Sequence, residues 1–230
     1  MADTDDDALL HSALYRFADP GATATIQSRY VRFFADVGAK TVLDVGCGTG
    51  VFLGLLADAG IQAVGVDSNP DAIEQCRHRG HDQVAVEDAM AYLERARTEG
   101  RRFDGVTLSH LIEHFAGPAG VRLLSLACDV VAPGGRILVA TPNVANLRTW
   151  THVFWVDPTH VRPYPRALIE ALLADKQFEI VASFDDALTR RAIGGWRGLL
   201  HIPRDVLALG TTPFRGGDSV VVGQRTVAAR

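Results

Sequence analysis

The sequence predicts an α/β fold, in which a doubly wound and mostly parallel sheet of seven strands carries helices on both faces. Three observations predict it. Short β-branched runs alternate with helical segments of about ten residues, glycine or proline stands at most junctions, and a glycine-rich turn follows the first run. Such alternation is typical of parallel strands joined by crossover helices, and we expect only the last strand to be antiparallel.

The first half of the chain carries the regular part of this pattern. Apolar residues at helical spacing predict a helix over residues 25–37. After it, glycine and proline punctuate the strands and helices. The expected strands are 41–45, 62–67, 83–86, 103–109 and 136–140, and the helices between them are 51–59, 70–79, 89–97 and 119–131.

The second half is less regular. A helix is expected over 166–174, a sixth strand over 179–184 and a final strand over 219–227. We interpret 1–230 as one domain, in which residues 1–40 form an N-terminal helical cap. The stretches 142–165 and 185–212 are expected to be insertions that bind the substrate or close over it.

Composition narrows the classes of partner. The 230 residues are 47% apolar and carry a formal net charge of −4, which argues against a nucleic-acid partner. Three cysteines without paired spacing argue against a disulfide framework. No signal-peptide pattern or long apolar run is found, so we expect a cytoplasmic protein without a membrane partner. Apolar residues within 193–209 favour a homodimer.

A glycine-rich turn after the first strand predicts a cofactor site. Gly46, Gly48 and Gly50 allow the backbone to turn sharply and to approach a ligand closely. The helix that follows offers unpaired N–H groups to a carboxylate. Asp67, seventeen residues past Gly50, ends the second strand, where its carboxylate can accept both hydroxyl hydrogens of a ribose.

The acid upstream of the turn distinguishes two cofactors. The nicotinamide pattern is G-x-G-x-x-G, whereas this turn reads G-x-G-x-G. Asp44, two residues before the first glycine, would repel a pyrophosphate and would attract an ammonium group. S-adenosylmethionine (SAM) carries an ammonium and a sulfonium and no phosphate, so the sequence favours SAM.

These segments resemble the motifs of class I SAM-dependent methyltransferases, which have a Rossmann-like fold. Residues 42–50 resemble the first motif, 65–67 the second and 87–89 the third, where an acid contacts the adenine amino group. Asp67 and Asp88 have an alternative role as helix caps. The expected cofactor-binding residues are Asp44, Gly46, Cys47, Gly48, Gly50, Asp67, Ser68, Asp88, Ala89 and Ser109.

Ionisable residues follow the fourth strand, beside the expected position of the methyl group. His110, Glu113 and His114 are three and four residues apart, which places them on one side of a helical turn. The stretch resembles the E-x-x-E-H segment of ubiquinone-pathway O-methyltransferases and of small-RNA 3′-end methyltransferases. In the RNA enzymes these residues, with a later histidine, hold a divalent cation. Here His110 replaces the first glutamate, so a metal such as Mg²⁺ stays an open alternative.

A later histidine lies in the stretch D-P-T-H-x-R-P at residues 157–163. This stretch resembles methyltransferases of bacterial polysaccharide synthesis, which implies a saccharide acceptor such as a mannoside. A neutral imidazole is a suitable base for a sugar hydroxyl, so we expect His114 or His160 as the base. Glu113 would orient the base or bind the metal, and His110 would line the cofactor.

The sequence therefore predicts a SAM-dependent O-methyltransferase acting on a saccharide. Three alternatives stay open: a phenolic or quinone-like small molecule as acceptor, a terminal ribose of RNA, and a non-catalytic SAM-binding subunit. The first is expected to show an apolar acceptor pocket. The second needs a basic face, and the third needs no ionisable cluster beside the methyl group.

Overall fold

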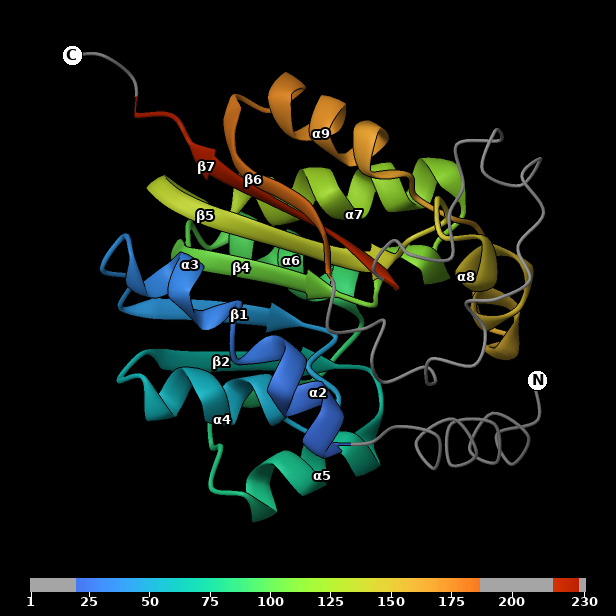
Figure 1. Cartoon of the computed structure of the whole chain (residues 1–230). Coiled ribbons are helices and arrows are strands. Elements are labelled where there is room, and N and C mark those ends of the chain that lie inside the picture. Colours follow the sequence, from blue (N-terminus) through green and yellow to red (C-terminus); the bar gives the residue numbers. More distant parts are fainter. Residues whose placement is uncertain (1–19, 187–216, 228–230) are drawn as a thin grey trace.

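The computed structural model describes residues 20–186 and 217–227, and these form a seven-stranded sheet in the order β3-β2-β1-β4-β5-β7-β6 (Figure 1). Strand β7 is antiparallel to both of its neighbours, and the other paired strands are parallel. The expected fold class is confirmed. The strands are β1 Thr41–Val45, β2 Gln62–Asp67, β3 Val84–Val86, β4 Phe103–Ser109, β5 Val131–Pro142, β6 Phe178–Asp186 and β7 Asp218–Arg225.

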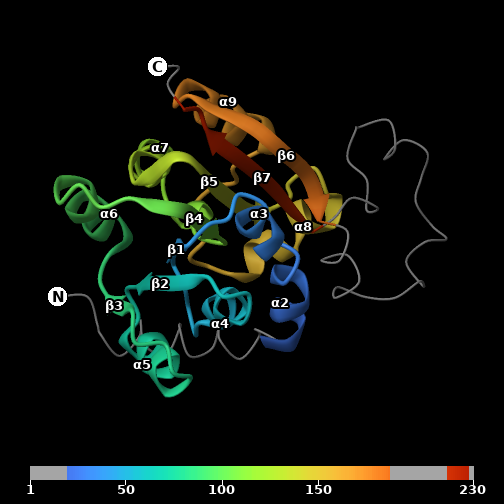
Figure 2. The same cartoon turned by 90° about the vertical axis from the view of Figure 1, so that its left-hand side faces the viewer.

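Helices cover both faces of the sheet (Figure 2). One face packs against α6 (Ala89–Thr98), α7 (Gly117–Asp129) and α9 (Arg166–Asp175) in the larger apolar core. The other face packs against α3 (Val31–Ala35) and α4 (Val51–Asp58), and α5 (Pro70–His78) contributes a small cluster beside α4. Because the central strands are buried from both sides, they read as continuous apolar runs in the sequence.

The N-terminal part differs from the single helix expected over 25–37. It contains two helices, α2 (Pro20–Gln27) and α3, separated by a turn at residues 28–30. The turn is tied to the end of β6, because Arg29 forms an ion pair with the buried Asp186 and the Tyr30 hydroxyl donates to the same carboxylate at 2.8 Å. This tie between residues far apart in the sequence holds the turn between α2 and α3 at the end of β6.

The segment between β5 and α9 lies at the carboxyl ends of the parallel strands (Figure 1). It contains α8 (Leu147–Thr151) and the short 3₁₀ helix η2 (Val153–Val156). The Asn146 side chain caps α8 by accepting two backbone N–H groups. The expected insertion at 185–212 lies outside the described residues except for its first two, and so do the first 19 residues of the expected cap.

Tyr164 fastens the end of this segment to α7. Its ring is buried, and its hydroxyl donates to the Phe115 carbonyl at 2.9 Å. The hydroxyl lies directly over Gly120 of α7, so that an added Cβ at Gly120 would overlap it. A glycine at this position is therefore required by close packing.

Gly120→Ala is expected to destabilise the protein by roughly 2–4 kcal/mol, because Tyr164 must move and lose its hydrogen bond in a packed core. Urea unfolding followed by circular dichroism measures the change. Gly54→Ala in α4 is the matched control, since a Cβ there meets its nearest neighbour at 3.7 Å. The control should be neutral or stabilising by up to about 1 kcal/mol, as alanine is the better helix former. Equal stability of both variants would contradict the packing argument.

Across residues 20–186 and 217–227, none of the helices has the length and apolar character needed to cross a membrane.

Candidate active site

The glycine-rich turn connects β1 to α4 at the carboxyl end of the sheet. Gly46, Gly48 and Gly50 all have left-handed backbone angles, with φ of 76°, 51° and 79°. Side chains at such angles are strained, which explains the three glycines. The turn is held against β2, because the Gly46 N–H donates to the Val66 carbonyl at 2.8 Å.

Asp67 braces this turn from the end of β2. Its carboxylate accepts the Gly48 N–H at 2.8 Å and the Asn69 N–H at 2.9 Å. The helix cap of α5 is Asn69 rather than Asp67, since the Asn69 side chain accepts the N–H groups of the first turn. For Asp88 the capping alternative is observed, because its carboxylate accepts the Ala91 N–H at the start of α6.

A cavity of about 280 Å³ opens beside the turn. Of the expected cofactor-binding residues, Gly50, Asp67, Ser68, Asp88 and Ala89 lie outside its lining, although Asp67 holds the lining residue Gly48. The lining residues that the sequence did not indicate come equally from α2, which packs beside α4, and from the turn and the start of α4. The lining consists of Pro20, Thr23, Gln27, Asp44, Gly46, Cys47, Gly48, Thr49, Val51, Phe52, Ser109 and His110.

Asp44 is the acidic residue of this lining. It is buried and accepts the Thr107 hydroxyl at 3.0 Å. Burial raises the pKa of Asp44 to about 7, the Thr107 hydrogen bond opposes the shift, and the nearby Asp67 adds to it. In the absence of a cation, Asp44 therefore changes its charge in the neutral pH range.

The affinity for SAM is expected to rise as the pH increases through about 7. A carboxylate attracts an ammonium group, whereas the protonated acid present below the raised pKa does not. Calorimetric titration with the demethylated product, S-adenosylhomocysteine, between about pH 5.5 and 8.5 measures the dependence. The control is Asp44→Asn, whose affinity should be low and flat across this range. An identical slope in the variant would assign the pH dependence to another group.

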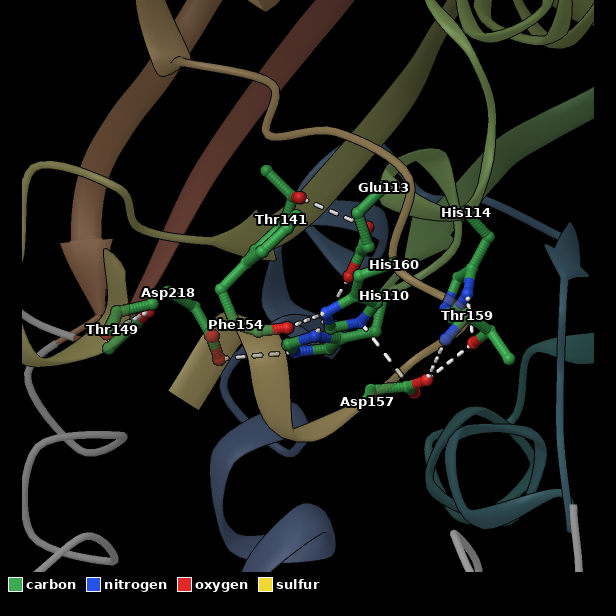
Figure 3. A network of polar contacts seen from close by, with 11 residues as sticks. His110, Glu113, His114, Thr141, Thr149, Phe154, Asp157, Thr159, His160 and Asp218 are labelled. Atoms are coloured by element: carbon green, nitrogen blue, oxygen red, sulfur yellow. Dashed lines mark hydrogen bonds and ion pairs between the residues drawn. The ribbon is translucent and has the colours of Figure 1, made fainter. Parts of the chain in front are cut away.

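Three of the four expected catalytic residues come together next to this cavity (Figure 3). Glu113 and His114 lie in the 3₁₀ helix η1 (Ile112–His114), and His160 comes from the segment after η2. One ligand atom of each lies within 4.8 Å of the other two, and the two imidazole rings are 4.9 Å apart. We call Glu113, His114 and His160 the triad.

His110 does not join the triad. It has a left-handed φ of 52°, and its two ring nitrogens face Glu113 and Asp218, each at 3.3 Å. Withdrawal from water lowers the pKa of His110, but the two carboxylates raise it by more, so that it lies well above the ordinary value. His110 lines the cavity and contacts Glu113, so it joins the cofactor cavity to the triad.

Glu113 is fully buried. Burial alone would raise its pKa, yet the hydrogen bond and charge of His110 hold the pKa of Glu113 below its ordinary value. One carboxylate oxygen accepts the Thr141 hydroxyl at 3.0 Å, and the other forms an ion pair with His110, whose Nδ1 lies 3.3 Å away. A buried, ionised carboxylate needs a compensating positive charge, so Glu113 is suited to contact a cation as well as His110.

The imidazoles of the triad are also oriented for a cation. Nδ1 of His160 lies 2.7 Å from the Phe154 carbonyl, and Nδ1 of His114 lies 2.9 Å from the Thr159 hydroxyl. A ligating histidine ordinarily uses its second nitrogen in this way, to fix the ring and its tautomer. The donor set of one carboxylate and two imidazoles therefore fits a divalent metal ion.

Known proteins resemble this chain in both sequence and fold. A family model described as a methyltransferase domain matches residues 18–183. A SAM-dependent methyltransferase from Archaeoglobus fulgidus superposes with a TM-score of 0.73 at 26% identity, covering 95% of this chain and 99% of that one. The magnesium protoporphyrin IX methyltransferase of Synechocystis, solved with bound SAM, superposes with a TM-score of 0.59 at 13% identity, covering 89% and 80%.

A curated relative is the ubiquinone biosynthesis O-methyltransferase of Serratia proteamaculans. It is 34% identical over 113 residues, which is 48% of this chain and 46% of that protein. The chain spans about half the length of the ubiquinone-pathway relatives that it matches.

The fold and the site define a methyltransferase of the SAM-dependent class. The matched family model covers most of the chain, so the chain belongs to the methyltransferase domain family. The expected enzyme class and the expected cofactor, SAM, are confirmed at this level. The Serratia relative and its counterpart in Hydrogenovibrio crunogenus are named for the ubiquinone pathway and not for polysaccharide synthesis.

Proposed function

We propose that this chain transfers the methyl group of SAM to a hydroxyl of a small phenolic or quinone-like molecule, assisted by a divalent cation. The observation that carries the proposal is the triad: Glu113, His114 and His160 present a compact donor set beside the cofactor cavity. A methyltransferase acting on a more nucleophilic atom has no need of such a set. A bound cation would supply Lewis acidity that lowers the pKa of the acceptor hydroxyl.

The residues of the chain have separate roles in this proposal. The turn at residues 46–50, Asp44 and Asp67 bind the cofactor and orient its methyl group. Glu113, His114 and His160 hold the cation, and an imidazole of the triad accepts the hydroxyl proton if no cation is bound. His110 keeps Glu113 ionised and oriented between the two parts of the site. Alignment of donor and acceptor then supplies much of the rate enhancement.

An aromatic or quinone-like acceptor is supported by the surface around the triad. Trp155, Val156 and Val161 are each about half exposed, and all three belong to the segment that carries His160. The Phe154 ring joins the two features, since it packs against His160 and against Trp155. The names of the relatives support the same acceptor class.

A saccharide is the second candidate acceptor. The ring centres of Trp150 and Trp155 lie 5.6 Å apart, and the two residues expose 40% and 54% of their surfaces. Exposed aromatic rings of this kind can stack against sugar rings. The resemblance of residues 157–163 to enzymes of polysaccharide synthesis favours it as well. The two exposed valines of the same segment, Val156 and Val161, favour the first candidate over this one.

Transfer of labelled methyl groups to a panel of acceptors tests the proposal. The panel contains catechols, hydroquinones, short mannosides and RNA ends, each with Mn²⁺ or Mg²⁺ and with a chelator. We expect label on a catechol or hydroquinone, at a rate that falls with the chelator. If only a mannoside is labelled, the acceptor is a saccharide, and the proposed methyl transfer to a hydroxyl still holds. Unchanged rates with the chelator would contradict the cation and favour a histidine base.

A further inference from the structure

We propose that Thr159, held by Asp157, is a positioning residue that fixes the tautomer of His114 and so leaves the lone pair of the neutral ring on Nε2, available to a cation. The inference rests on the proposed function for its purpose, but its geometry is independent of any acceptor. It gives a role to Asp157 and Thr159 of the D-P-T-H stretch, which belong neither to the cavity lining nor to the triad.

Asp157 fixes the direction of the Thr159 hydroxyl. One Asp157 carboxylate oxygen lies 2.5 Å from the Thr159 hydroxyl oxygen and accepts the Thr159 backbone N–H at 2.8 Å (Figure 3). The same oxygen therefore faces two hydrogens of Thr159, one on the backbone nitrogen and one on the hydroxyl. An oxygen that already accepts an N–H acts as an acceptor, so the hydroxyl donates its single hydrogen to Asp157.

The hydroxyl oxygen is then left only as an acceptor toward His114. Nδ1 of His114 lies 2.9 Å away, which is a normal hydrogen-bond distance. Since the hydroxyl hydrogen is committed to Asp157, the hydrogen of this bond belongs to Nδ1. In the neutral ring the lone pair is consequently on Nε2, the nitrogen that the Thr159 contact leaves unoccupied.

In His160, a backbone carbonyl fixes the same tautomer. A carbonyl oxygen can only accept, so the contact of 2.7 Å between His160 Nδ1 and the Phe154 carbonyl requires a hydrogen on Nδ1. Both imidazoles therefore carry the lone pair of the neutral ring on Nε2, and His160 Nε2 also lies 3.8 Å from the second carboxylate oxygen of Asp157. The hydrogen on Nδ1 is fixed by a side chain only in His114. A substitution can therefore test it there.

Thr159→Val tests the inference because it removes the hydroxyl and keeps the shape of the side chain. Thr159→Ser keeps the hydroxyl and serves as the conservative variant. Thr151→Val is the matched control, since the Thr151 hydroxyl donates only to the Leu147 carbonyl within α8. The full chain is labelled with ¹⁵N-histidine, and His114→Ala assigns the His114 signals.

The first readout is the nitrogen spectrum of the metal-free protein at about pH 8.5, above the ordinary pKa of imidazole. We expect His114 to carry its hydrogen on Nδ1 in the wild type, in Thr159→Ser and in Thr151→Val. In Thr159→Val the hydrogen should shift toward Nε2. A wild-type hydrogen on Nε2, or an unchanged tautomer in Thr159→Val, would overturn the inference.

The second readout is the calorimetric affinity for Mn²⁺. Removing a hydrogen bond behind a ligand typically weakens a metal site about 10- to 100-fold, and we expect this loss in Thr159→Val only. Wild-type affinity in Thr159→Val would also overturn the inference. A wild type that binds no Mn²⁺ would instead contradict the cation in the proposed function, and the nitrogen spectrum would then decide the role of Thr159 alone.

Discussion

Glu113→Gln is expected to lower the rate constant of methyl transfer by about 100- to 1,000-fold, in the range of a lost acid–base or charge contribution. Glutamine keeps the volume of the buried side chain and can still accept the Thr141 hydroxyl. What it removes is the negative charge beside His114 and His160. The affinity for SAM should stay within about twofold, because Glu113 does not line the cofactor cavity.

Single-turnover transfer of labelled methyl groups measures this rate constant, and calorimetry with S-adenosylhomocysteine measures the cofactor affinity. Glu74→Gln is the matched control, since Glu74 is exposed on α5 and lies 4.0 Å from the His78 ring. The control should match the wild type in both measurements. A rate within tenfold of wild type for Glu113→Gln, with the fold intact by circular dichroism, would remove the triad from the mechanism.

The same substitution probes His110. In the wild type His110 lies between the carboxylates of Glu113 and Asp218, and the loss of one lowers the preference for a charged imidazole. Nitrogen spectra of labelled histidine should therefore show a lower pKa for His110 in Glu113→Gln. This result would separate the role of His110 as a counter-charge from a role in the reaction itself.

The elements that could be predicted from the sequence are those whose cause is local. Strands β1, β2 and β4 have the bounds expected, because short apolar runs between polar and glycine residues are typical of buried parallel strands. Strand β5 begins at Val131 rather than at 136, since its first residue pairs with Phe103 before an irregularity in the register. A Pro-Gly-Gly sequence inside a strand is not a local signal for one.

The parts of the site that could not be predicted depend on distant contacts. Spacing placed His110 on one side with Glu113 and His114, but the left-handed backbone of His110 turns its ring toward Asp218, over a hundred residues later. The helix α2 contributes to the cavity lining, and Tyr30 in the turn after it donates to Asp186 at the end of β6. No pattern within a window of the sequence contains these ties.

Asp67→Ala is expected to weaken the binding of SAM at least about 100-fold. A hydrogen bond to a charged group contributes roughly 1.5–3 kcal/mol, and the ribose loses up to two of them if the expected contact exists. The turn is affected as well, because Asp67 accepts the Gly48 N–H at 2.8 Å and Gly48 lines the cavity. Asp82→Ala, at an exposed position after α5, is the control and should bind as the wild type does.

Two measurements separate these contributions. Urea unfolding of the cofactor-free protein measures how much the contact of Asp67 with the turn stabilises the fold. We expect Asp67→Ala to lower the free energy of unfolding by about 1–3 kcal/mol. Calorimetry with S-adenosylhomocysteine and with its ribose-deoxy analogues reports the contact with the sugar. If Asp67 binds the ribose, the wild type should discriminate against the deoxy analogues and Asp67→Ala should not. If Asp67→Ala is less stable but discriminates as the wild type does, Asp67 acts only through Gly48, and the second-strand acid is a structural support of the turn.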